Sequence, residues 1–119
     1  MADPVVHFEI ASKDGKASQE FYSKLFGWKI NADNPMNYGV VETGSDQGIG
    51  GGIFQTDENM KPHVTVHVEV DDPDAYLKKI EKMGGTTIVP VTVVPGMVTF
   101  ALFVDPLGQT VGLVKAGQH

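Results

Sequence analysis

The sequence predicts an α+β protein made of two halves, each with the order strand, helix and three strands (βαβββ). Two stretches, residues 5–10 and 63–70, alternate apolar and polar side chains, which is typical of half-buried strands. Each stretch is followed by a segment whose apolar residues recur at helical spacing. Short strand-like runs, separated by Asn, Asp, Pro and Gly, complete both halves.

The first half begins with the strand "VVHFEI", residues 5–10. The next segment, "SKDGKASQEFYSKLFG", has apolar residues four apart and ends at Gly27, which predicts an amphipathic helix with a glycine stop. We expect its large apolar side chains to pack into the core: Phe21, Tyr22, Leu25 and Phe26. The runs "WKI", "NYGVVET" and "GGGIFQT" then predict three short strands.

The second half begins with the strand "HVTVHVEV", residues 63–70. Asp71 or Asp72 then caps a helix in which Pro73 is tolerated at the first turn. Two glycines, residues 84–85, end this helix, and the run "TTIVPVTVVPGMVTFALFVDPLGQTVGLVK" supplies three more strands.

A weak internal repeat relates the two halves. A shift of 58 residues superposes helix caps, helix residues and helix stops: Asp14 on Asp72, Leu25 on Met83, and Gly27 on Gly85. The same shift places His7 on Thr65 and Glu9 on His67. The polar face of the first strand therefore corresponds to the polar face of the fifth.

Length and composition indicate one ordinary globular domain. The 119 residues suffice for one core and are too few for two independent ones. We predict a single domain with modules of about 1–57 and 58–119, divided near the polar segment "FQTDENMKPH". The absence of cysteine excludes disulfides and thiolate chemistry.

The net charge of −6, with no cluster of Lys or Arg, argues against nucleic acid and anionic membranes as partners. The apolar runs are only a few residues long, and no signal peptide is evident at the start, so we expect a cytoplasmic protein. Curled open sheets expose strand edges that a second copy can cover, so we also expect a homodimer.

Three stretches resemble the vicinal oxygen chelate superfamily, which includes glyoxalase I, bleomycin-resistance proteins and extradiol dioxygenases. They are "VVHFEIASKDGKASQEFYSKLFGWKI", "VDDPDAY" and "FVDPLGQTVGL", in the order that this superfamily shows. The resemblance implies a glyoxalase/bleomycin-resistance-like fold, in which the mixed sheet of two βαβββ modules curls around a concave cavity with the helices outside. In members with metal-dependent chemistry, it implies one ligand from the first strand and one from the last strand of each module.

Only one of these four ligand positions is retained. The first-strand histidine matches His7, whereas its counterpart in the second module is Thr65, a poor ligand. Gly112 stands where a Glu is usual, and residues 52–54 contain no carboxylate. Because a divalent ion normally needs at least three protein ligands, we expect no metal cofactor. The alternative is a relocated zinc, nickel, iron or manganese site made by His7, Glu9, His67 and Glu69.

Five polar side chains are expected to point into the concave cavity: His7, Glu9, Thr65, His67 and Glu69. The opposite faces are apolar surfaces that the helices need to cover: Val6, Phe8 and Ile10 with Val64, Val66, Val68 and Val70. The other interpretations are a strand histidine satisfied by backbone or solvent at His7, and an exposed polar sheet face at His67 and Glu69. His63 is expected at the surface.

Three functions fit this pattern. The first is a metal-independent binder of a small molecule, with this candidate ligand set: His7, Glu9, Tyr38, Phe54, Thr65 and His67. The second is an isomerase, lyase or hydrolase in which His7 or His67 is the general base, oriented by Glu9 or Glu69. The third is a structural or regulatory dimer without a ligand.

Overall fold

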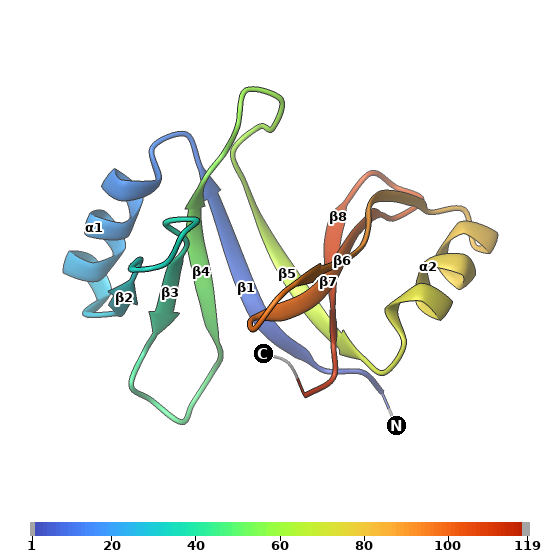
Figure 1. The fold of residues 1–119 in the computed structure, drawn as a ribbon, viewed down its shortest axis with the longest axis horizontal. Helices are drawn as coiled ribbons and strands as arrows, with labels where there is room; N and C mark the ends of the chain where they lie inside the picture. Colours follow the sequence, from blue (N-terminus) through green and yellow to red (C-terminus); the bar gives the residue numbers. More distant parts are fainter. Residues whose placement is uncertain (1, 118–119) are drawn as a thin grey trace. The chain divides into compact units, whose positions relative to one another are not determined.

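The computed structural model describes residues 2–117 and confirms the α+β class (Figure 1). Within these described residues, two helices and eight strands follow one another in the order that the sequence predicts. Their bounds are β1 (Val5–Ser12), α1 (Gly15–Phe26), β2 (Lys29–Asn31), β3 (Gly39–Glu42), β4 (Gly50–Gln55), β5 (His63–Val70), α2 (Pro73–Lys82), β6 (Thr86–Val94), β7 (Val98–Val104) and β8 (Thr110–Lys115).

By its internal contacts the chain divides into two compact units. Residues 7–64 form one of them, here called the α1 unit. The described residues before 7 join those from 65 onward in the other, the α2 unit. The module boundary near residue 57 stays a prediction, because the contacts group the first residues of the chain with the second half.

In the α1 unit, the strand order is β2-β3-β4-β1. β1 and β4 run parallel, with Glu9 opposite Gly52, and the other pairs are antiparallel. The Asp14 side chain caps α1 by accepting a hydrogen bond from the Ala17 N–H at 3.1 Å. Gly27 ends the helix in the left-handed conformation, with φ of 73°, as its sequence position predicts.

The α2 unit repeats this pattern with the order β5-β8-β7-β6. β5 and β8 run parallel, with His67 opposite Gly112. Glu9 and His67 therefore occupy matching positions, each opposite a glycine of the last strand in its unit. This register agrees with the 58-residue shift that superposes Glu9 on His67.

The helix of the α2 unit begins and ends where the sequence indicates. Asp72 is the cap that accepts a hydrogen bond from Ala75 N–H at 3.2 Å, and Pro73 occupies the first turn. Inward-facing apolar residues form the core of this unit: Val70, Leu77, Ala101 and Leu113, with Val68, Tyr76, Ile80, Val91 and Phe103 packed against them.

The expectation that the large apolar side chains of α1 pack into the core is wrong. Phe21, Leu25 and Phe26 are 58%, 57% and 57% exposed, whereas only Tyr22 of that group is half-buried. Polar side chains occupy the inward face of α1 instead. Gln19 Nε2 donates to the Ile53 carbonyl at 2.8 Å, and Ser23 Oγ donates to the Trp28 carbonyl just beyond the helix at 3.0 Å. The apolar stripe that predicted a helix core therefore points outward.

The valine face of β5 is covered along only half of its length. Val70 is buried and Val68 is half-buried under α2, but Val64 and Val66 are 68% and 40% exposed. The physical reason is the length of α2, whose ten residues span roughly 15 Å and reach only the end of the strand that leads into the helix.

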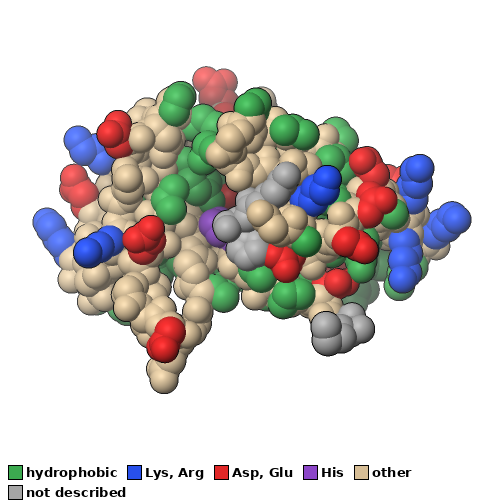
Figure 2. Space-filling model, turned by 60° about the horizontal axis from the view of Figure 1, so that its bottom comes forward, with side chains coloured by type: hydrophobic (Ala, Val, Ile, Leu, Met, Phe, Trp, Pro, Cys, Tyr) green, Lys and Arg blue, Asp and Glu red, His purple; other side chains and the backbone are tan. Residues whose placement is uncertain are grey.

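Charged side chains of both signs share one face of the molecule (Figure 2). On the face shown in Figure 2, lysine and acidic side chains are intermingled, and the lysines do not gather into one broad patch. Among the described residues, neither helix has the length and apolar composition needed to cross a bilayer.

Candidate functional site

A chain of three hydrogen-bonded side chains lies on the polar face of β1. Tyr38, from the loop before β3, donates its hydroxyl proton to Glu9 Oε2 at 2.8 Å. The same hydroxyl oxygen is 2.9 Å from His7 Nε2. His7 and Glu9 are two residues apart on one strand, so their side chains share a face and Tyr38 bridges them.

Tyr38 is held firmly by its own loop and by the neighbouring strand. Asn34 donates to the Tyr38 carbonyl at 2.7 Å and accepts from the Tyr38 N–H at 2.9 Å. The phenol ring lies over Gly52, where a Cβ atom would collide with the ring and its hydroxyl. Phe54 flanks the same ring, with centroids 5.8 Å apart and planes 20° apart. The ring is therefore fixed before any ligand arrives.

The burial of Tyr38 and its charged neighbour indicate where the protons of Tyr38 and His7 lie. Burial raises the pKa of Tyr38 far above its ordinary value, and the charge of Glu9 and the hydrogen bond to it raise the pKa further. Tyr38 is therefore a neutral phenol that donates to Glu9. Its oxygen then accepts from His7, so the proton of a neutral His7 ring sits on Nε2 and the basic lone pair on Nδ1.

The corresponding position in the α2 unit contains a buried imidazole. Thr65 and His67 are each 3% exposed. The His67 ring lies over Gly112 and occupies the space that a side chain at that position would need. The interpretation of His67 as part of an exposed polar face is therefore wrong, while Glu69 of the same face is half-buried.

The residues present fit a family-type metal site poorly. Gly112, which stands at a usual ligand position, and Gly52, within the range 52–54 that lacks a carboxylate, are covered by the rings of His67 and Tyr38. The hydroxyl of Tyr38 also engages His7 and Glu9, two of the four groups that would form a relocated site. Within the part of the chain that the structure describes, no three His, Asp or Glu side chains form a metal-binding group.

The structure brings together four of the residues predicted for the ligand site: His7, Glu9, Tyr38 and Phe54. Thr65, His67 and Glu69 belong to the α2 unit. His63 is half-buried at the start of β5, where its Nδ1–H donates to the Lys61 carbonyl at 2.8 Å. His119, expected to carry no function, lies outside the described residues. Sequence reasoning missed Asn34, whose only signal was its place in the turn-rich segment "NADNPMNY".

Comparison with known proteins agrees with this architecture. Residues 5–44 match the family model "Bleomycin resistance protein-like N-terminal". A relative from Mycobacterium bovis, "Putative glyoxylase CFP32", is 29% identical over 118 residues, which cover 93% of this chain and 45% of that protein. The chain spans about half the length of the curated relatives it matches.

Solved structures share the fold at low sequence identity. Methylmalonyl-CoA epimerase from Mycobacterium tuberculosis superposes with a TM-score of 0.69 and 16% identity, over 93% of this chain and 86% of that one. A glyoxalase/bleomycin resistance protein/dioxygenase superfamily member from Vibrio splendidus 12B01 gives a TM-score of 0.64 and 14% identity, over 96% and 99% of the two chains. Together these matches support the vicinal oxygen chelate superfamily as the family that this chain resembles.

Proposed function

We propose that this protein binds a small organic molecule on the polar face of β1, at the group formed by His7, Tyr38 and Glu9. The observation that carries the proposal is the preformed hydrogen-bond chain through the Tyr38 hydroxyl. Fixed polar groups beside an aromatic wall, here Phe54, are typical of small-molecule sites. The superfamily neighbours include an epimerase whose name specifies a small acyl-CoA substrate, which agrees with this class of ligand.

The proposed site works without a divalent metal. The support is chemical, because Gly112 stands where a Glu is usual, residues 52–54 contain no carboxylate, and ring side chains fill the space above Gly52 and Gly112. Elemental analysis of purified protein, combined with native mass spectrometry for retained ligands, tests this part. Near-stoichiometric zinc, nickel, iron or manganese that is lost in both His7→Ala and His67→Ala proteins would refute it.

The binding site itself is tested with a fragment library screened by NMR. Fragments should perturb the amide signals of Glu9, Tyr38 and Gly52. Tyr38→Phe removes one hydroxyl, and we expect the affinity of such fragments to fall about tenfold, since losing a hydrogen bond to a charged group costs at least about 1.4 kcal/mol. Tyr76→Phe, a matched loss of a hydroxyl that donates to Asp3 in the α2 unit, should leave affinity unchanged.

Substitution of His7 separates binding from structure. If His7 belongs to the ligand site, alanine at this position should weaken fragment binding and leave the melting temperature nearly unchanged. A lower melting temperature with intact binding would show instead that His7 is structural.

Acid–base catalysis is the second candidate function, favoured by the inferred proton position on His7. With Nε2–H donated to Tyr38, Nδ1 is the basic atom of the neutral ring, and Glu9 acts on it through Tyr38. Methylmalonyl-CoA, the substrate that the epimerase is named for, is a direct probe in D₂O. Deuterium incorporation that disappears in His7→Ala would support catalysis, and no exchange above the buffer rate would exclude it for this substrate.

We further propose that the protein works as a cytoplasmic homodimer. Superfamily folds of this size leave strand edges and apolar surface that a second copy can cover. Light scattering that shows only a 12.8 kDa species at micromolar concentration would contradict the dimer.

A further inference from the structure

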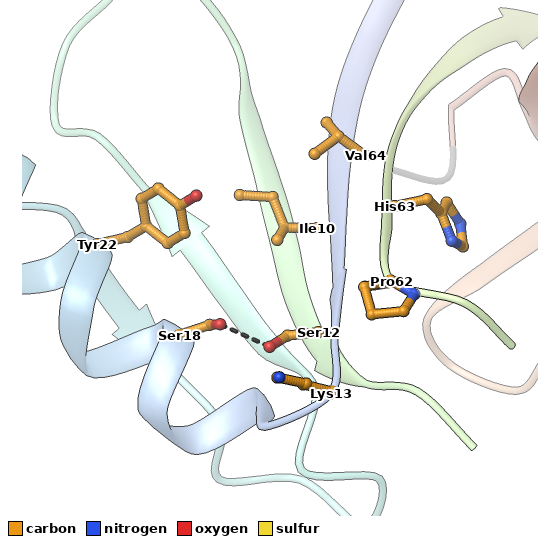
Figure 3. A pocket seen from close by; sticks show the side chains of 9 residues that line it. Ile10, Ser12, Lys13, Ser18, Tyr22, Pro62, His63 and Val64 are labelled. Atoms are coloured by element: carbon orange, nitrogen blue, oxygen red, sulfur yellow. Dashed lines mark hydrogen bonds between the residues drawn. The ribbon is translucent and has the colours of Figure 1, made fainter. Parts of the chain in front are cut away.

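The inward face of helix α1 is small and polar, and it is anchored to two strands of its unit. Gly15, Ser18 and Gln19 lie on this face at the spacing of one helix turn. Ser18 points to Ser12 at the end of β1, where their hydroxyl oxygens are 2.6 Å apart (Figure 3). Gly15 packs so closely on β4 that a Cβ atom would lie 2.9 Å from the Gln55 nitrogen. Helix α1 is therefore closely seated on the strand that runs beneath the phenol ring of the ligand site.

Gln19 connects this helix to two parts of the ligand site. Its Nε2 donates to the Ile53 carbonyl at 2.8 Å. Ile53 follows Gly52, the residue beneath the Tyr38 ring. The same nitrogen donates to the carbonyl of Asn37, the neighbour of Tyr38, over a longer distance of 3.4 Å. Because an amide nitrogen carries two hydrogens, one side chain can hold both acceptors.

The residue after Tyr38 makes room for the Gln19 amide. A Cβ atom on Gly39 would lie 2.7 Å from Gln19 Nε2. Gly39 is buried and does not have a positive φ, so this position uses the small size of glycine and not its backbone freedom. Gly39 also pairs with Ile53 in the register of β3 and β4. The amide therefore lies where the Tyr38 loop joins the sheet.

The loop itself, residues 34–38, is shaped by Asn34. The Asn34 Oδ1 accepts from the N–H groups of Met36 and Tyr38 at 3.2 and 2.9 Å, and all of these contacts stay within the loop. Asn37 adopts a φ of 52°, in the left-handed region that side chains other than glycine seldom occupy. Gln19 binds the carbonyl of this residue and links the loop to α1 and β4.

We propose that Gln19 is a positioning residue of the ligand site, which fixes the Tyr38 loop against β4 and so sets where the Tyr38 hydroxyl stands. The inference rests on the proposed function and deepens it by naming how the site is controlled. Helix α1 supplies none of the candidate ligand residues, yet its seating on the sheet would determine the affinity of the site.

A double-mutant cycle with Tyr38→Phe tests whether Gln19 acts through the hydroxyl. Gln19→Met keeps the length of the side chain and removes its amide. We expect fragment affinity, measured by NMR, to fall about two- to tenfold, which is the usual worth of one hydrogen bond. In the Tyr38→Phe background, the same substitution should change affinity by less than about twofold. Unchanged affinity in the single variant, or an equal loss in both backgrounds, overturns the positioning role.

Gln55→Met is the matched control, because it also removes an amide that holds α1 to the sheet. Gln55 Oε1 accepts from the Gly15 N–H at 2.7 Å, and its Nε2 donates to the Lys13 carbonyl at 2.6 Å, so its bonds join β4 to the start of α1. Both variants should melt at a lower temperature, and only Gln19→Met should lose affinity. Equal losses of affinity would show a general loosening of α1 and would overturn the specific role of Gln19.

A measurement without ligand separates this inference from the proposed function. The chain has three tyrosines, so their Cζ signals can be assigned in carbon-13 NMR spectra. Gln19→Met should move the Tyr38 Cζ signal and leave that of Tyr76, in the α2 unit, in place. If no fragment binds the unmodified chain, the proposed ligand site fails while this shift still tests the positioning. A Tyr38 signal that does not move in Gln19→Met overturns it.

Discussion

Replacing Gly112 with alanine tests the packing of the buried imidazole most directly. A Cβ atom at this position would lie 2.8 Å from His67 Cγ and nearer still to two other ring atoms. The ring is 3% exposed, so it cannot yield without disturbing its surroundings. Overpacking of this kind costs about 1–3 kcal/mol. At roughly 4 °C per kcal/mol for a chain of this size, the melting temperature should fall by about 4–12 °C.

A double-mutant cycle with His67→Ala isolates the contact. If the methyl group collides with the ring, removing the ring should recover part of the loss, with a coupling of about 0.5–3 kcal/mol measured by urea unfolding. The control pair combines Gly112→Ala with Met83→Ala, which changes an exposed residue and should be additive. A neutral Gly112→Ala protein, or full additivity with His67→Ala, would refute the placement of the ring.

Three further changes are informative. Folding raises the pKa of Tyr38 above its ordinary 10.0, so the unfolded chain loses this proton at a lower pH than the folded chain does. The free energy of unfolding should therefore fall as the pH rises above 10. Urea unfolding at a series of pH values should show a flatter decline for Tyr38→Phe. Leu77→Ala should lower the free energy of unfolding by about 2–5 kcal/mol and Leu25→Ala by less than about 0.5 kcal/mol, because the two side chains are 7% and 57% exposed. Equal losses of stability in thermal unfolding would contradict the outward orientation of the apolar face of α1. Asp72→Ala should remove a cap worth about 1 kcal/mol, whereas Asp74→Ala in the first turn should cost less, as read by melting temperature.

The sequence predicted the fold well because the fold depends on local signals. The caps Asp14 and Asp72 and the stop at Gly27 act within a few residues of themselves, so their spacing could be read directly. The alternation of apolar and polar residues in the first strand likewise predicted that His7 and Glu9 share one face.

The orientation of α1 could not be read in the same way. Apolar spacing shows that a helix has two faces, and it does not show which face meets the sheet. A hydrogen bond from Gln19 to the Ile53 carbonyl, 34 positions away, holds the polar side inward. This partner is brought close only by the tertiary fold, so the exposure of Phe21 and Leu25 had no local signature.

The candidate site was predicted in its residues but not in its connections. Tyr38 was predicted as a ligand-site residue, but its partners His7 and Glu9 are 31 and 29 positions away in the chain, so no local pattern showed that Tyr38 bridges them. Only the register of β1 against β4 shows that Gly52 makes room for the phenol.

The residues just before β1 contact the second half of the chain. The Pro4 carbonyl accepts a hydrogen bond from the Glu69 N–H at 2.9 Å, and the Tyr76 hydroxyl donates to Asp3 at 2.6 Å. A C-terminal fragment that begins at the boundary between the two repeats would thus lack the contacts that Asp3 and Pro4 provide. A circular permutant can join the original ends and begin near residue 64. Each unit would then be continuous in the sequence, so we expect this permutant to fold better than two fragments separated at the boundary of the repeats.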